Sequence, residues 1–189
     1  ETTYLQGRKM LEQVYPFSFE LADVYAQRSM PEKMVEEYLS LLEFNESYLP
    51  NIQAILQNKM AFDLEGGLND IIRTSLLRKV QRGNQKPVYN ELLYWLLLQE
   101  KDFTTALIQA KALDKRNDEN GSRLIGLGRL CVSNQQYDVA EECFSYVIAK
   151  GNQNTNYITA RMELIGTRDK KITESGAYQK SDLIKLEQD

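Results

Sequence analysis

The stretch "LLQEKDFTTALIQ", residues Leu97–Gln109, contains a break between two apolar segments without a glycine or a proline. Four polar residues, Gln99 to Asp102, separate the two segments. Because each flank is apolar at helical spacing, we expect one helix to end before the polar residues and a second to begin directly after them. Asp102 is a suitable N-cap, since its carboxylate can accept a hydrogen bond from the free N–H groups of Thr104 or Thr105. The stretch therefore predicts a tight helical hairpin.

The same pattern returns 34 residues further along the chain, where Phe103 falls on Tyr137 and Ala106 falls on Ala140. The first third of the chain carries a matching copy, and the region 51–82 carries one more with a residue or two inserted. A fixed period of this length indicates stacked copies of one supersecondary unit. We expect each copy to be a pair of antiparallel helices, in which small residues let the two backbones approach closely.

The copy in residues 123–151, "RLIGLGRLCVSNQQYDVAEECFSYVIAKG", resembles the tetratricopeptide repeat. Its first helix has Leu127 followed by the small residue Gly128, and its second helix has an aromatic, a small residue and a second aromatic at Tyr137, Ala140 and Phe144. The resemblance implies an all-α fold, in the form of a right-handed α-solenoid of antiparallel helical hairpins. It also implies a concave groove lined by the first helix of each hairpin.

We expect a single domain over residues 1–189, cut from a longer repeat array of a larger bacterial protein. The copy in residues 90–113 departs from the repeat at Tyr94, Ala110 and Leu113. Residues 167–182 are polar and break the repeat, which predicts a long loop that reshapes the array or serves as a linker. The apolar periodicity predicts helices near residues 4–14, 17–29, 31–44, 48–62, 67–82, 87–100, 102–116, 119–134, 136–150, 154–167 and 179–189.

The composition favours a helical protein that binds neither nucleic acid nor the membrane interior. Four prolines and ten glycines in 189 residues are too few for the turns of a β-sandwich of this length. The net charge of −4 offers no basic face to neutralise phosphates, so we expect no nucleic-acid partner. No apolar run approaches the roughly 20 residues that cross a bilayer, so we expect no membrane insertion.

The residue types also argue against catalysis and metal binding. The chain has no histidine, which removes the commonest general base and the usual zinc ligand. We therefore expect no enzyme, no metal and no cofactor. The Gly126-Leu127-Gly128 segment lacks the third glycine of a nucleotide-binding loop and predicts close helix packing instead. In residues 114–123, Arg116 occupies a position where a calcium loop needs a ligand, so Gly121 is interpreted as a helix stop.

Two further sets of paired residues receive structural interpretations. Cys131 and Cys143 flank one predicted hairpin, and helix geometry places their Cα atoms about 9–11 Å apart, beyond disulfide reach. We expect two free thiols, with Cys131 in the core. The acidic pairs 36–37 and 141–142 occupy adjacent helix positions, which do not converge on one point. They are interpreted as solvated helix faces.

Trp95, the only tryptophan, is the strongest candidate for contact with a partner. In the frame set by Phe103 it occupies a first-helix position that faces the concave groove in tetratricopeptide repeats. Tryptophan and arginine are favoured anchors of protein interfaces. The alternative is that Trp95 packs against the neighbouring repeat. Helical spacing and the repeat together predict a partner-binding surface made of Trp95, Glu91, Leu98, Gln99, Ile125 and Arg129.

The sequence thus predicts a non-catalytic protein–protein interaction scaffold that binds a partner peptide or helix in a concave groove. The alternative is a structural spacer or self-association module of a larger envelope protein, which would form a homo-oligomer. The family resemblance suggests a bacterial origin. The compartment stays open between the cytoplasm and the bacterial periplasm or envelope, because the chain begins inside a helical pattern and a signal segment could precede it.

Overall fold

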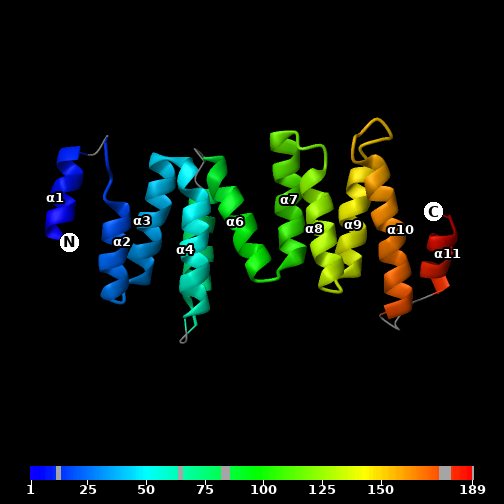
Figure 1. The fold of residues 1–189 in the computed structure, drawn as a ribbon, viewed down its shortest axis with the longest axis horizontal. Coiled ribbons are helices and arrows are strands. Elements are labelled where there is room, and N and C mark those ends of the chain that lie inside the picture. The colour runs from blue at the N-terminus through cyan, green and yellow to red at the C-terminus, as the bar shows by residue number, and fades with distance from the viewer. Residues whose placement is uncertain (12–13, 64–65, 82–85, 175–179, 189) are drawn as a thin grey trace. The chain divides into compact units, whose positions relative to one another are not determined.

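The computed structural model describes residues 1–11, 14–63, 66–81, 86–174 and 180–188, and every regular element within these ranges is helical (Figure 1). The all-α prediction is therefore confirmed. The chain divides into two compact units, Glu1–Leu96 and Leu97–Asp189, and α6 carries the boundary. Within each unit, consecutive helices alternate in direction (Figure 1).

The first unit has its core between α2, α3 and α5. The helix α3 packs against α2 on one side and against α5 on another. Tyr38 of α3 and Leu21 of α2 are almost fully buried in this core, and Pro31 begins α3 because a missing N–H costs nothing in a first turn. The elements of this unit are α1 (Thr2–Leu11), α2 (Ser18–Gln27), α3 (Pro31–Phe44), the short 3₁₀ turn η1 (Glu46–Tyr48), α4 (Leu49–Ala61), α5 (Leu68–Gln81) and most of α6 (Pro87–Gln99).

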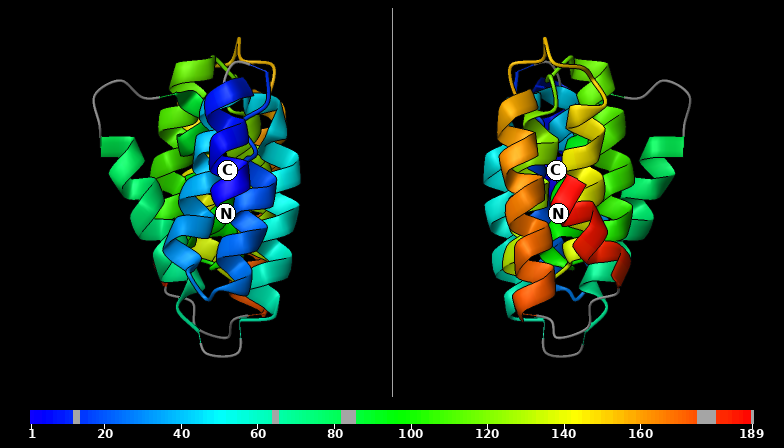
Figure 2. Two further views of the ribbon diagram at one scale, coloured as in Figure 1. Left: turned by 90° about the vertical axis from the view of Figure 1, so that its left-hand side faces the viewer. Right: turned by 90° about the vertical axis from the view of Figure 1, so that its right-hand side faces the viewer.

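The second unit is a series of helices that each pack against the next one in the sequence. Contacts also join α7 to α9 and α8 to α10, so each hairpin rests on its neighbour. Figure 2 shows α9, α10 and α11 beside one another at the C-terminal end of this unit. Its elements are α7 (Phe103–Asn117), α8 (Ser122–Ser133), α9 (Tyr137–Ile148), α10 (Tyr157–Glu174) and α11 (Lys180–Gln188).

One turn geometry ends three helices, α2, α6 and α8, and explains how they end without glycine. Ser29, Lys101 and Gln135 each adopt a left-handed backbone, with φ of 53°, 57° and 60°. In each case the next residue donates its backbone N–H to the carbonyl five residues earlier, at 2.8–2.9 Å. This left-handed residue and its 6→1 hydrogen bond form the Schellman helix ending. The left-handed positions lie 72 and 34 residues apart, so the turns follow the predicted period.

The predicted cap of α7 is confirmed. The Asp102 carboxylate accepts a hydrogen bond from the Thr105 backbone N–H at 3.2 Å, at the start of α7. The aromatic side chains that begin α7 and α9, Phe103 and Tyr137, are 5% and 6% exposed. The break in the opening stretch is therefore a left-handed turn residue followed at once by a capped helix start.

The loop predicted for residues 167–182 is wrong in its first half, because α10 continues to Glu174. Thr167 is buried, and the polar side chains that follow it are held by α9. Arg168 contacts the Glu141 carboxylate at 3.2 Å, and Lys171 contacts that of Asp138 at 2.6 Å. These contacts stabilise a helical segment that has no apolar periodicity. Residues 175–179 lie outside the described residues.

Two glycines of the second unit are required by close contacts. A Cβ added at Gly128 would lie 2.5 Å from the buried ring of Phe144, so the predicted close approach of α8 and α9 is confirmed. Gly121 has a φ of 85°, and a Cβ there would lie 2.7 Å from Val147. Gly121 precedes α8, however, and the left-handed residue that ends α7 is Asp118, so the interpretation of Gly121 as a helix stop is wrong.

Both cysteines are free and completely buried, one on α8 and one on α9. The prediction of two free thiols with Cys131 in the core is therefore confirmed. Contact with the Cys131 thiol and burial both raise the pKa of Cys143, so this thiol stays protonated at neutral pH. Cys143 is consequently a packing residue of the hairpin and no thiolate nucleophile.

Candidate binding surfaces

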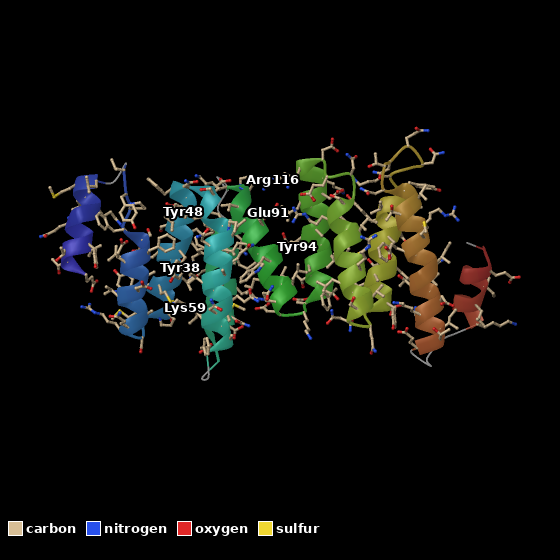
Figure 3. The ribbon with its side chains drawn as sticks, viewed as in Figure 1. Tyr38, Tyr48, Lys59, Glu91, Tyr94 and Arg116 are labelled. Carbon is tan, nitrogen blue, oxygen red and sulfur yellow. The ribbon has the colours of Figure 1, made fainter. Side chains whose placement is uncertain are left out.

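The predicted partner-binding residues on α6 share one side of the helix. Glu91, Trp95 and Leu98 follow one another at intervals of four and three residues, and each is half-buried. Figure 3 shows Glu91 on this helix. Among the described residues the Trp95 indole N–H has no hydrogen-bond acceptor. A partly covered indole usually forms a hydrogen bond through its N–H. The Trp95 N–H can therefore donate to water or to a partner. Gln99 ends the helix and is exposed.

The two predicted residues on α8 have different surroundings. Ile125 is 6% exposed and belongs to the core of the second unit, so it offers almost no surface to a partner. Arg129 lies one turn further on and is exposed, with its guanidinium 2.7 Å from the Glu163 carboxylate on α10. An ion pair this open to water stabilises the fold by less than about 1 kcal/mol and can exchange for another carboxylate. Arg129 therefore remains available, and Ile125 does not.

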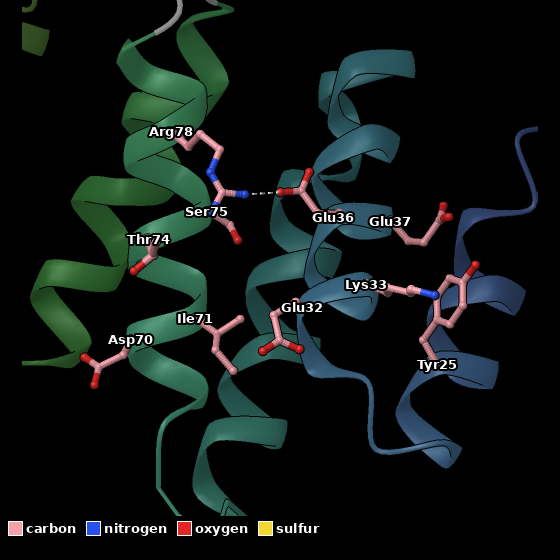
Figure 4. Close-up of a pocket in the computed structure, with 10 residues that line it drawn as sticks. All are labelled: Tyr25, Glu32, Lys33, Glu36, Glu37, Asp70, Ile71, Thr74, Ser75 and Arg78. Atoms are coloured by element: carbon pink, nitrogen blue, oxygen red, sulfur yellow. Dashed lines mark ion pairs between the residues drawn. The ribbon is translucent and has the colours of Figure 1, made fainter.

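A hollow of about 450 Å³ opens in the first unit between α2, α3 and α5 (Figure 4). We call it the α3–α5 hollow. In Figure 4, Ile71 of α5 and Glu32 of α3 face one another across it, and the Ser75 hydroxyl turns toward the same space. None of the six predicted residues lines it. The residues that do are Tyr25, Glu32, Lys33, Glu36, Glu37, Asp70, Ile71, Thr74, Ser75 and Arg78.

Ion pairs close part of this hollow and leave part open. Arg78 pairs with Glu36 at 3.6 Å across its upper end in Figure 4. Arg8 of α1 pairs with Glu37 at 2.5 Å. Glu32 and Asp70, in contrast, have no ion-pair partner among the described residues. The lining therefore holds two uncompensated carboxylates.

The aromatic wall of the hollow is neutral. Burial, together with the nearby carboxylates of Glu1 and Glu37, raises the pKa of Tyr25 above its ordinary value, so the phenol stays protonated at neutral pH. Its hydroxyl donates to Glu1 at 3.3 Å. The Lys33 ammonium lies 5.4 Å from the centre of the Tyr25 ring, which holds this cation against the ring face.

None of the predicted site residues pointed to this hollow. The pair Glu36-Glu37 is interpreted above as a solvated face, but Glu37 is only 9% exposed and is held by Arg8. Glu141 of the second acidic pair likewise has a largely covered side chain, held by Arg168. Both corrections have one cause, which is that the partner cation comes from another helix. The only local signal of the hollow is that its lining residues recur at intervals of three or four on one helix, as Ile71 and Ser75 do on α5.

The described residues offer no metal centre and no membrane span. Among them, no group of three or more cysteine, aspartate or glutamate side chains is arranged to hold a metal ion. Of the helices that the structure describes, none has both the length and the apolar character needed to cross a bilayer.

Comparison of the chain with known proteins gave no match. No protein-family model matches the sequence, no curated protein matches it, and no solved structure matches the fold.

Proposed function

We propose that the chain is a non-catalytic scaffold of stacked helical hairpins, arranged as a tetratricopeptide-like right-handed α-solenoid, that binds a peptide or helix of a protein partner on a concave face. The observation that carries the proposal is the recurrence of one Schellman turn at Ser29, Lys101 and Gln135. Repeated hairpins of one geometry stack side by side, and such stacks present extended concave binding surfaces. The absence of histidine from the sequence argues against acid–base catalysis.

The α6 face supplies the first contact surface of this proposal. Trp95 combines a large apolar area with an indole N–H that has no acceptor among the described residues. Glu91, Leu98 and Gln99 follow on the same helix. Arg129 on α8, in the second unit, is a separate candidate contact. Aromatic and arginine side chains of this kind dominate the binding energy of protein interfaces.

We expect Trp95→Ala to weaken peptide binding at least tenfold, about 1.4 kcal/mol, because truncation removes the apolar anchor. A library of random 12-residue peptides is selected on the immobilised chain, and the affinity of the best binders is measured by isothermal titration calorimetry. The matched control is Phe62→Ala, which truncates a ring that is 82% exposed and lies outside α6. Circular dichroism must show that both variants are folded. If Trp95→Ala and Arg129→Glu both bind the selected peptides as tightly as the original chain does, these residues are not the contact surface.

The second candidate function is a spacer or self-association module. The observation that favours it is an apolar row on α10, where Ile158, Met162 and Ile165 are 66%, 69% and 38% exposed and lie on one side of the helix. If this row joins two copies of the chain, light scattering after gel filtration will give a dimer mass, and Met162→Glu will restore the monomer. A monomer at all concentrations that nevertheless selects peptides would favour the scaffold.

A further inference from the structure

We propose that the α3–α5 hollow binds an arginine side chain of the partner protein. This inference rests on the proposed scaffold function and assigns it a second contact site with a defined chemistry. Four features of the hollow carry the inference, namely a hydroxyl without a partner, a net negative lining, an apolar wall and an exposed carboxylate opposite that wall.

The hydroxyl of Ser75 is the feature that points to a ligand. Ser75 is 4% exposed, yet its side chain lines the hollow and makes no hydrogen bond to any described residue. A serine inside a helix commonly satisfies itself on the carbonyl four residues earlier, as Thr167 does with Glu163 at 2.7 Å. Ser75 instead turns toward the space between α5 and α3 (Figure 4). Because the Ser75 hydroxyl lines the hollow without a partner among the described residues, a donor that enters the hollow gains this hydroxyl as an acceptor.

The charges of the lining select a cation. The acidic residues Glu36 and Glu37 already have arginine partners, and Lys33 is held against the Tyr25 ring. Glu32 and Asp70 remain uncompensated among the described residues. Each lies in the first turn of its helix, where the helix dipole stabilises a carboxylate, and this explains their presence without any ligand. The dipole does not explain the open Ser75 hydroxyl beside them.

The shape of the hollow favours a side chain over a bare metal ion. Ile71 provides an apolar wall that can cover the methylene stem of a long side chain, while Glu32 faces it across the opening (Figure 4). No group of described acidic residues is arranged to ligate a metal. A guanidinium has five N–H donors in a planar fork, so it can pair with the Glu32 carboxylate through two bonds and still donate to Ser75. The compact ammonium of lysine cannot make this bidentate pair.

The experiment uses the full chain and the selected 12-residue peptides. We expect the selected peptides to be enriched in arginine, and replacement of the key arginine by lysine or by its neutral analogue citrulline to weaken binding about tenfold. Glu32→Gln should weaken binding of the arginine peptide about tenfold and leave binding of the citrulline peptide unchanged. Ser75→Ala should weaken the arginine peptide severalfold. The matched control is Glu46→Gln, the same change at an exposed first-turn carboxylate outside the hollow.

The outcomes separate this inference from the proposed function. If peptides are selected and bind Glu32→Gln and Ser75→Ala as tightly as the original chain, the arginine site is overturned and the scaffold proposal stands. Equal binding of the lysine peptide also overturns it, because it removes the role of the bidentate pair. If no peptide of any composition is selected, the scaffold proposal fails and the arginine site fails with it. Circular dichroism melting curves exclude loss of folding as the cause of weaker binding.

Discussion

Asp114→Ala is expected to lower the free energy of unfolding by about 3 kcal/mol, because it breaks a buried network that no other residue can complete. The Asp114 carboxylate has no solvent exposure, and its three partners are one residue of α9 and one residue in each of the turns that follow α7 and α9. It pairs with the Lys150 ammonium at 2.7 Å, accepts from the Gly121 backbone N–H at 2.6 Å and accepts from the Tyr146 hydroxyl at 3.0 Å. Urea denaturation followed by far-ultraviolet circular dichroism measures the loss.

The control for this prediction is Glu142→Ala, which removes a carboxylate 3.5 Å from Lys111 at the surface. Because the Glu142 side chain is 66% exposed, water screens the pair, and we expect a change below about 0.5 kcal/mol. Similar losses for the two variants would contradict the assignment of Asp114 as the centre of the network.

The same network should give the fold a measurable acid sensitivity. Burial alone would raise the pKa of Asp114, but the hydrogen bonds from Lys150, Gly121 and Tyr146 outweigh it and lower the pKa below the ordinary 3.8. A carboxyl whose pKa is lower in the folded chain stabilises the fold above pH 3.8, and this contribution is lost as the pH falls through the folded value. The difference in unfolding free energy between the original chain and Asp114→Asn should therefore shrink below about pH 4. If the difference in unfolding free energy between the two proteins does not change with pH, the prediction is wrong.

Two glycines only two residues apart on α8 should respond to alanine with opposite signs. At Gly128 a Cβ would lie 2.5 and 2.6 Å from the Phe144 ring and 3.2 Å from the Cys143 Cβ. The ring is completely buried and cannot move aside, so overpacking costs about 1–3 kcal/mol. The better helix propensity of alanine, about 1 kcal/mol, offsets only part of this cost. We expect a net loss of stability in urea denaturation.

Gly126 provides the matched control, because a Cβ there would meet nothing within 4 Å. Gly126→Ala should therefore stabilise the chain by up to about 1 kcal/mol through helix propensity alone. If the variants change stability in the same direction, α8 and α9 are further apart than the structure shows. Adding Phe144→Leu to Gly128→Ala should recover part of the loss, since the smaller side chain makes room for the new Cβ.

The two contact sites that we propose differ in how they could be recognised. Trp95 stands out in the sequence because it is a single tryptophan at a repeat-defined position. The α3–α5 hollow stands out only in three dimensions, because α3 and α5 place Glu32 and Ile71 across from one another although 39 residues separate them in the chain. A partner that used both sites would place one group against Trp95 and an arginine side chain in the α3–α5 hollow.

Local sequence patterns were enough to place the helices and the cap that begins α7, but the left-handed turn residues came from the structure. Apolar spacing locates helix faces, Pro31 and Pro87 begin helices, and Asp102 caps α7, since each of these effects acts over a few neighbouring residues. Gly128 also followed from local pattern, because the repeat requires a small residue where two helices of one hairpin approach. Interactions of this kind join residues that are close in the chain, so the order of the residues is enough to predict them.

Which polar side chains are buried, and where a hollow remains, depends on how the helices pack in three dimensions. The Glu37 carboxylate is buried because Arg8 of another helix neutralises it, and α10 continues to Glu174 because Arg168 and Lys171 find carboxylates on α9. Whether Ile125 is covered and whether Ser75 has a partner likewise depend on the neighbouring helices. The free energy of a charged or polar group depends on what surrounds it in space, and these neighbours are far away in the sequence.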